Sequence, residues 1–263
     1  MNLNLKNKVA VVLASSTGIG FEIASALAGE GCSIAMCARR KESLEAAAKQ
    51  IRDKYKVPVI TKITDLSIHK EIDEFFDFVY EEYKDIDILI NNSGGPKSGS
   101  CLSLSDNDYY EAFSLVLMSK IRAVKRVMPG MIMQGSGKII NIESTGIKNV
   151  MNNMALSNIF RSGSNAFAKT LASENIRSGI RVHTIMLGPF LTDRLVELGN
   201  VAAKNLEIDF ETWKLKAAES TPLGRFGLAN EIGPIVAFLA SEKSNYMNGL
   251  CFAVDGGVLQ SIN

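Results

Sequence analysis

The chain has 263 residues, of which 46% are hydrophobic and 22% are charged, a composition typical of a globular protein with one large domain or two small ones. Its 29 basic and 28 acidic residues give a net charge of +1 with no basic stripe, which argues against nucleic-acid binding. The longest apolar runs, such as residues 9–14, are too short to span a membrane, and no signal peptide is evident. We therefore expect a cytoplasmic protein with no membrane partner.

Strand-like apolar runs alternate with longer amphipathic stretches along the whole chain. Residues 8–14 form a continuous hydrophobic run, as expected for a strand that is covered on both faces, and Ser105 with Asp108 predicts a capping box. In chain order, strands are predicted over residues 8–14, 33–38, 59–63, 86–91, 138–142, 181–187 and 250–254, and helices over residues 20–29, 42–55, 68–83, 105–128, 153–177 and 230–241.

This alternation predicts an α/β fold in which one doubly wound parallel sheet of about seven strands carries helices on both faces. No linker or internal repeat divides the chain, so residues 1–263 are expected to form a single domain. The mixed, charged stretch 192–221, which Gly199 interrupts, lies between a strand and the next strong helix. We expect it to form one or two mobile helices that act as a lid, with a plain surface insertion as the alternative.

A glycine-rich segment, Ala-Ser-Ser-Thr-Gly-Ile-Gly at residues 14–20, lies where the first strand ends and the first helix begins. In a doubly wound fold this is the place where helix amides point at a phosphate. Gly18 and Gly20 would let the backbone approach the anion. The hydroxyl groups that could add donors are those of Ser15, Ser16 and Thr17.

The second strand ends at Ala38 and is followed by Arg39 and Arg40, where a fold that prefers NAD usually places an acidic residue. Two arginines could instead pair with a 2′-phosphate, which favours NADP over NAD. The alternative is that they only solvate the start of a helix. The four cysteines are scattered, and buried free thiols are the expected state of Cys32 and Cys37.

Six segments together resemble one protein family. They are Ser-Ser-Thr-Gly-Ile-Gly at 15–20, with Ala14 in place of the first glycine of that family's motif, Asp65-Leu66, Asn91-Asn92-Ser93-Gly94, Gly-Pro-Phe-Leu-Thr at 188–192, Thr-Pro-Leu-Gly-Arg-Phe-Gly at 221–227, and Asn248-Gly249 with Val-Asp-Gly-Gly at 254–257. The chain resembles the short-chain dehydrogenase/reductase family over essentially its full length, in the branch similar to β-ketoacyl-carrier-protein reductases. The resemblance implies a Rossmann fold, a bound dinucleotide and a homotetramer or dimer. The cofactor contacts it implies, together with those predicted above, are Ser15, Ser16, Gly18, Ile19, Gly20, Arg39, Arg40, Asp65, Leu66, Asn92, Ser93, Gly94, Arg161, Gly188 and Thr192.

The resemblance also implies a catalytic set that this chain changes. In the family a Ser orients the carbonyl oxygen, a Tyr transfers the proton, a Lys four residues later lowers the pKa of the phenol, and an Asn supports a water. Ser144 matches the family's Ser, whereas Ser157, Arg161 and Val116 stand at the Tyr, Lys and Asn positions. The chain is similar to a variant group of the family with Ser-Asn-x-x-Arg at this place.

The changed residues limit the chemistry. A Ser alcohol is a far weaker acid than a phenol, whose pKa is about 10, and Arg161 stays protonated at any useful pH. Arg161 can still act as a fixed cation that binds ribose hydroxyls or clamps an anionic group of a substrate. Lys97 and Lys148 are alternative proton donors, with solvated loop lysines as the simpler interpretation. No metal site is expected.

Three hypotheses remain open from the sequence. The first is an NADP-preferring oxidoreductase that acts on a small carbonyl or alcohol substrate through Ser144, Ser157 and Arg161, with protons supplied through water. The second is a catalytically impaired dinucleotide-binding or scaffolding protein. The third is non-redox chemistry, such as elimination or isomerisation, on the same fold.

Overall fold

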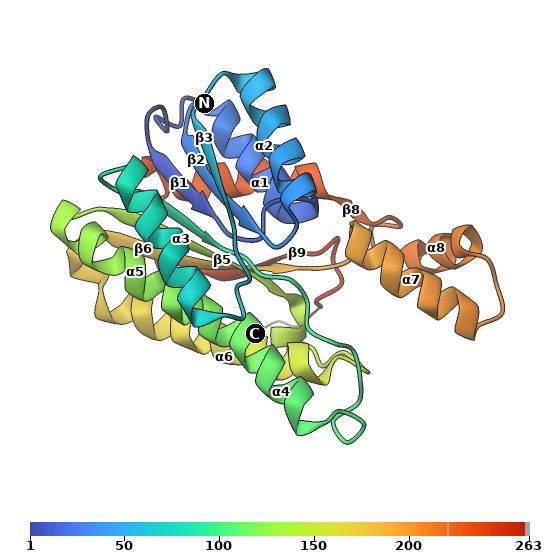
Figure 1. Ribbon diagram of the computed structural model, residues 1–263. Helices are drawn as coiled ribbons and strands as arrows, with labels where there is room; N and C mark the ends of the chain where they lie inside the picture. The colour runs from blue at the N-terminus through green and yellow to red at the C-terminus, as the bar shows by residue number, and fades with distance from the viewer. Residues whose placement is uncertain (220, 261–263) are drawn as a thin grey trace.

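A parallel sheet of seven strands organises the chain, and its order is β3-β2-β1-β4-β5-β6-β9 (Figure 1). The computed structural model describes residues 1–219 and 221–260. The strands are β1 (Val9–Val12), β2 (Ser33–Ala38), β3 (Val59–Ile63), β4 (Ile88–Asn91), β5 (Gly137–Ser144), β6 (Ile180–Leu187) and β9 (Cys251–Val254), and a separate short pair joins β7 (Phe190–Leu191) to β8 (Gly227–Leu228). The predicted doubly wound α/β fold is confirmed.

Helices cover both faces of this sheet because its strands are apolar on both sides. Neighbouring strand residues point to opposite faces, so Val12 packs in one hydrophobic core and Val11 in the other. Helices α1 (Gly18–Gly29), α2 (Lys41–Tyr55) and α9 (Gly233–Ala240) contribute to the first core, and α3 (His69–Glu82), α5 (Ser119–Gln134) and α6 (Ala155–Glu174) to the second. One-turn 3₁₀ segments lie at Thr145–Ile147, Ile176–Ser178, Ala229–Glu231 and Glu242–Ser244.

The strand order reverses at β1, which pairs with β2 on one side and with β4 on the other. Val12, the last residue of β1, is in register with Met36 of β2 and Ile90 of β4. The connections that leave the carboxyl ends of β1 and β4 therefore turn away from each other. In a doubly wound sheet this point forms the crevice in which ligands bind.

The long helix expected over residues 105–128 is interrupted. It begins as α4 (Asp106–Ala112), with the predicted capping box between Ser105 and Asp108, and widens into a π-helix over Phe113–Met118. It then continues as α5 past Pro129 to Gln134, where Gly135 ends it in the left-handed region at φ 64°. The prediction ended this helix at Met128. The helix continues through Pro129 because one missing hydrogen bond does not end a helix whose apolar face is buried.

The stretch after β6 contains two helices, α7 (Asp193–Asn205) and α8 (Phe210–Glu219), which project from the body of the molecule (Figure 1). Gly199 does not interrupt α7. A Cβ atom at Gly199 would lie 2.2 Å from the Trp213 ring, so the glycine lets α8 pack closely against α7. The Trp213 ring also stacks on Phe210 and Phe226. The role of these helices as a lid stays a prediction.

Candidate active site

A cleft of about 1250 Å³ lies at the carboxyl ends of the central strands, at the crevice that the strand order predicts. The residues that line it come from the loops after β1, β2, β3, β4, β5 and β6 and from helices that include α4, α6 and α7. It brings together these sequence-predicted residues: Ser16, Gly18, Ile19, Gly20, Arg39, Arg40, Asp65, Leu66, Asn92, Ser93, Gly94, Ser144, Ser157, Arg161, Gly188 and Thr192.

Ser15 is placed differently from its neighbours. Its side chain is fully buried, and its hydroxyl donates to the Val12 carbonyl at 2.8 Å instead of facing the cleft. Its amide donates to the Cys37 carbonyl, so Ser15 joins the ends of β1 and β2. Sequence position alone could not separate this hydroxyl from that of Ser16.

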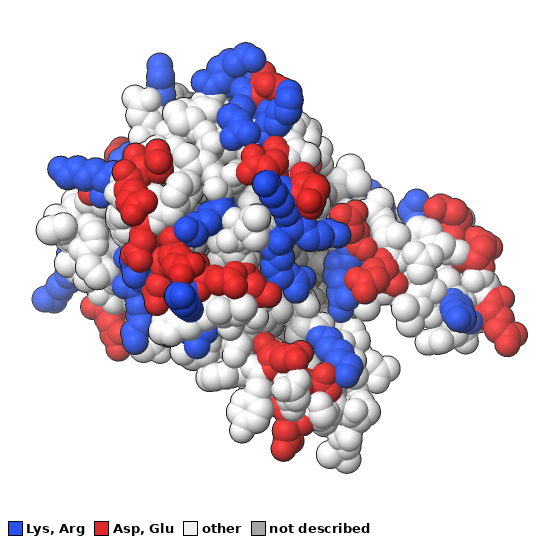
Figure 2. Space-filling view, in the orientation of Figure 1, with Lys and Arg blue, Asp and Glu red and all other residues white. Residues whose placement is uncertain are grey.

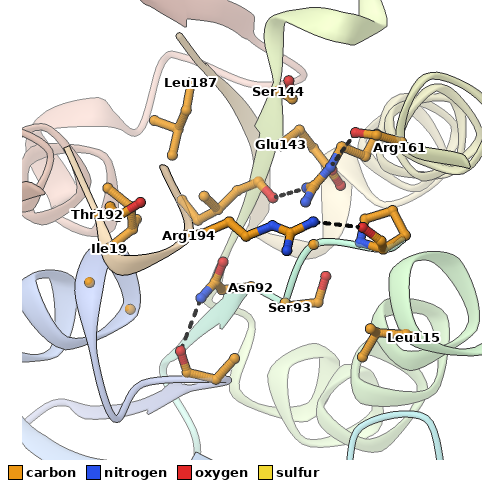
Figure 3. A pocket seen from close by; sticks show the side chains of 18 of the residues that line it. Ile19, Asn92, Ser93, Leu115, Glu143, Ser144, Arg161, Leu187, Thr192 and Arg194 are labelled. Atoms are coloured by element: carbon orange, nitrogen blue, oxygen red, sulfur yellow. Dashed lines mark hydrogen bonds and ion pairs between the residues drawn. The ribbon is translucent and has the colours of Figure 1, made fainter. Parts of the chain in front are cut away.

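The glycine loop depends on its two glycines for different reasons. Gly18 has φ 56°, the left-handed region that favours glycine. A Cβ atom at Gly20 would lie 2.3 Å from the Ala14 carbonyl oxygen, so only glycine fits there. Asn92, at the end of β4, donates its side-chain amide to the carbonyls of Leu13 and Ala14 at 3.2 Å each (Figure 3). The Asn92 side chain, next to the neighbouring strand β4, thus holds the start of the glycine loop in position.

Two features of the cleft suit a phosphorylated dinucleotide. The side chains of Arg39 and Arg40 are exposed at its edge, and within the described residues neither guanidinium group has an ion pair or hydrogen bond. The Ser93 hydroxyl lines the cleft and is buried, yet it finds no hydrogen-bond partner in the part of the chain that the structure describes. A buried polar atom without a partner is costly, and a ligand in the cleft would satisfy it.

The three predicted catalytic residues all line the cleft. Ser144 ends β5; its Oγ accepts a hydrogen bond from the Gly146 amide at 3.2 Å, and its O–H faces a weak acceptor, the Met151 sulfur, at 4.0 Å. Ser157 and Arg161 lie one turn apart on α6, and the Arg161 Nε donates to the Ser157 Oγ at 3.2 Å. Both hydroxyl oxygens already accept a hydrogen bond, so both O–H protons are available to a stronger acceptor.

Glu143, which the sequence analysis did not select, binds Arg161 at the same place. Its carboxylate accepts from Arg161 Nη1 at 2.9 Å (Figure 3). It also accepts from Ser164 Oγ at 2.6 Å and from the Lys120 ammonium. The side chains of Glu143 and Lys120 are both 0% exposed. Burial lowers the pKa of Lys120 to about 8, against the attraction of Glu143. A carboxylate directly before Ser144, at the end of a predicted buried strand, was the signal that could have identified this group.

Arg194, at the start of α7, is a second residue that the sequence did not identify. It lines the cleft, and its Nη2 donates to the Pro96 carbonyl at 3.1 Å (Figure 3). Its Nη1 pairs with Glu197 at 2.9 Å. Pro96 follows the Asn92-Ser93-Gly94 segment, and Arg194 follows Thr192. The side chain therefore joins two loops that border the same end of the cleft.

The other candidates lie in less suitable places. Lys97 lines the cleft, but its ammonium pairs with Asp108 at 2.8 Å, an interaction that holds the pKa of Asp108 at about 2. Lys148 is exposed. His183 is buried in β6, and His69 pairs with Asp73 on α3. Within residues 1–219 and 221–260, no three His, Cys, Asp or Glu side chains are grouped to hold a metal ion.

Acidic and basic side chains are interspersed over the face shown in Figure 2, in keeping with the small net charge. Within the described ranges, no helix combines the length and the apolarity needed to cross a bilayer. Both Cys32 and Cys37 are buried free thiols, as predicted, and burial raises the pKa of each to about 12.

Known proteins resemble this chain in sequence and in fold. The family model described as Enoyl-(Acyl carrier protein) reductase matches residues 13–259. The 3-oxoacyl-[acyl-carrier-protein] reductase FabG of Aquifex aeolicus is 30% identical over 259 residues, which cover 98% of this chain and 100% of the relative. FabG of Staphylococcus epidermidis is 31% identical over 255 residues, which cover 96% of this chain and 99% of the relative.

Two solved structures share the fold closely. The L-sorbose reductase of Gluconobacter frateurii, crystallised with NADPH and L-sorbose, superposes with a TM-score of 0.95 at 30% identity and covers 100% of both chains. A variant of the actinorhodin polyketide ketoreductase, crystallised with NADPH, has a TM-score of 0.93 at 29% identity and covers 97% of this chain and 98% of its own.

Proposed function

This chain belongs to the short-chain dehydrogenase/reductase family of oxidoreductases, and on that premise we propose that it reduces a small carbonyl compound with NADPH. The observation that carries the proposal is the meeting of two hydroxyl groups, Ser144 and Ser157, with the glycine loop in one cleft. The cofactor is supported by the relatives crystallised with NADPH and by the unpaired Arg39 and Arg40.

The cleft offers a partner for each part of NADP(H). Gly18 and Gly20 leave room for the diphosphate, and Arg39 and Arg40 would hold the 2′-phosphate. Asp65 and Leu66 would hold the adenine. The residues left for the nicotinamide end are Ile19, Asn92, Ser93, Gly94, Arg161, Gly188 and Thr192. When bound, the cofactor supplies a hydride to the carbonyl carbon.

The protein's own contribution is to stabilise the negative charge that develops on the carbonyl oxygen. Ser144 and Ser157 each have an O–H proton that can be donated to that oxygen, in the manner of an oxyanion hole. Neither alcohol is acidic enough to replace the tyrosine, so the alkoxide formed by hydride transfer takes its proton from bulk solvent, relayed through a water molecule that is itself reprotonated. Arg161 acts as a fixed cation beside Ser157, and a substrate with an anionic group would use the same charge.

We also propose a homo-oligomer and a cytoplasmic location. Tyr110, Phe113 and Ile159 on the neighbouring α4, π-helix and α6 segments are exposed, which suits a contact with a second copy of the chain. All four cysteines are free thiols, in keeping with a reducing compartment.

Fluorescence titration and turnover assays test the function. We expect NADPH to bind at least tenfold more tightly than NADH, and the double variant Arg39→Ala/Arg40→Ala to lose that preference because it lacks the 2′-phosphate partners. Arg177→Ala, an exposed arginine on the 3₁₀ turn after α6, is the matched control. Equal binding of the two nucleotides by the unaltered protein would contradict the NADP assignment.

The turnover assay follows NADPH oxidation with a panel of ketoses and 3-oxoacyl thioesters that includes L-sorbose. Reduction of any member supports the proposed reaction. Tight NADPH binding with no turnover on any member would instead favour the second candidate, a dinucleotide-binding protein without catalysis. The observation that favours this candidate is the replacement of the family's Asn, Tyr and Lys by Val116, Ser157 and Arg161.

A further inference from the structure

Hydrogen bonds from two of its nitrogens, Nε and Nη1, hold the guanidinium group of Arg161 in place. Its Nε contacts Ser157 Oγ at 3.2 Å, and its Nη1 contacts both Glu143 Oε2 at 2.9 Å and the Ile142 carbonyl at 3.3 Å (Figure 3). Within the described residues, Arg161 provides the one hydrogen bond that the Ser157 hydroxyl makes. The direction of that hydroxyl therefore depends on where the guanidinium group lies.

Glu143 in turn cannot move away from Arg161. Its Oε1 accepts from Ser164 on α6 at 2.6 Å and from Lys120 on α5, and Lys120 also donates to the Ile142 carbonyl at 3.1 Å. A carboxylate that receives donors from two helices and has no exposed surface is fixed in one orientation. The Glu143 side chain thus joins α5, α6 and β5 at the floor of the cleft.

The charges of this group do not cancel. Lys120 and Arg161 carry two positive charges against one negative charge on Glu143, and the group lies beside Ser144 and Ser157. Buried ion pairs are weak stabilisers, because the cost of removing charges from water offsets their attraction. The residual positive charge does, however, favour negative charge on a ligand atom next to the two hydroxyl groups.

We propose that Glu143 is a positioning residue, fixed by Lys120, which orients Arg161 so that its Nε binds the Ser157 oxygen and leaves the Ser157 proton for the carbonyl oxygen of the substrate. This inference rests on the proposed function, because it gives Ser157 a carbonyl to bind. It adds Glu143 and Lys120 to a reaction for which the sequence indicated only Ser144, Ser157 and Arg161.

The substitution Glu143→Gln tests the proposal, because it keeps the shape of the side chain and removes its charge. Glu231→Gln is the matched control, since Glu231 is also paired with an arginine, Arg225, but lies outside the cleft. The first readout is the Nε–H resonance of Arg161 in nitrogen-15 NMR, which is assigned by its absence in Arg161→Lys. The second is the separate change of kcat and of the KM for NADPH on the best substrate of the carbonyl panel.

We expect Glu143→Gln to speed exchange of the Arg161 Nε proton with water by at least tenfold. We also expect kcat to fall by at least tenfold, with the KM for NADPH changed less than twofold, and Glu231→Gln to change neither readout. A merely structural role would not separate kcat from KM in this way. An unchanged exchange rate of the Arg161 Nε proton in Glu143→Gln overturns the proposal, and so does an unchanged kcat.

The test still gives a result if Glu143→Gln misfolds or if the unaltered protein shows no turnover. If Glu143→Gln does not give folded protein, the double variant Lys120→Met/Glu143→Gln carries the same two readouts, because it removes one buried cation together with the anion. If the unaltered protein reduces no member of the panel, the proposed function fails. The NMR readout then still decides whether Glu143 orients Arg161.

Discussion

At the residue scale, Ala14 occupies a backbone conformation that suits it poorly. It stands where the family has its first glycine, and its φ of 49° lies in the left-handed region. For an alanine this region costs roughly 1–2 kcal/mol. The glycine loop therefore contains one residue whose side chain opposes its backbone conformation.

We expect Ala14→Gly to raise the free energy of unfolding by about 1 kcal/mol, because glycine adopts the same φ without strain. Urea denaturation measures the change. Ala46→Gly, at an exposed position within α2, is the control and should lower the free energy of unfolding by about 1 kcal/mol. A loss of stability in Ala14→Gly would show that the backbone there is not strained.

Glu143 also affects the activity expected when the family's Tyr and Lys are put back at positions 157 and 161. In Ser157→Tyr/Arg161→Lys the new lysine would meet the carboxylate that now binds Arg161, and that negative charge would offset its effect on the pKa of the phenol. We expect the double variant to gain less than tenfold in carbonyl reduction, and the triple variant with Glu143→Gln to gain more. NADPH oxidation measures both. A gain of tenfold or more in carbonyl reduction by the double variant would contradict the effect that we assign to Glu143.

At the element scale, Arg194 ties α7 to the loop after β4. Its hydrogen bond to the Pro96 carbonyl links residues that are 98 positions apart in the chain. A single hydrogen bond of this kind contributes about 0.5–1.5 kcal/mol. The position of α7 over the cleft thus depends in part on one side chain.

We expect Arg194→Ala to increase hydrogen exchange of the α7 amides about three- to tenfold, as follows from losing that one contact. Hydrogen–deuterium exchange with mass spectrometry measures this. Lys214→Ala, which removes a pair within α8, should leave α7 unchanged. If the α7 amides exchange at the same rate in Arg194→Ala, the hydrogen bond from Arg194 to Pro96 does not hold the helix in place.

The sequence predicted most elements, because each has a strong local pattern. Strands β2 and β3 have the predicted bounds, and α2 begins one residue earlier than expected. The π-helix at Phe113–Met118 was not predicted, since its residues also suit an α-helix and differ only in hydrogen-bond spacing. The contacts of Glu143 with Lys120, and of Arg194 with Pro96, join distant segments, and no local pattern contains them.

At the scale of the whole molecule, the stability of the fold depends on keeping His183 neutral. Its two ring nitrogens are buried and lack a hydrogen-bond partner in the described part of the chain. Burial, together with Lys138 and Arg181, lowers its pKa from 6.5 to about 4. Protonation must therefore oppose folding. This stability is complete above pH 6.5 and is lost as the pH falls towards 4.

We expect the free energy of unfolding to be about 2 kcal/mol lower at pH 5 than at pH 7 because of this one group. Urea denaturation at the two pH values measures the difference, and His183→Leu should remove most of it. His69→Gln, which changes an exposed histidine, should retain it. An equal pH dependence in His183→Leu would assign the effect to other groups.

The position of β9 at the edge of the sheet has a consequence for synthesis. The six other strands of the sheet, including β1 and β4 at the crevice, are translated before β9, which pairs only with β6 in the sheet. A nascent chain can therefore assemble the strands at the crevice before β9 has been translated. Gly188, which lines the cleft, lies against Asp255, the residue after β9, and a Cβ atom on Gly188 would be 2.6 Å from Asp255. A ligand that binds before β9 is translated would therefore find the Gly188 side of the cleft incomplete.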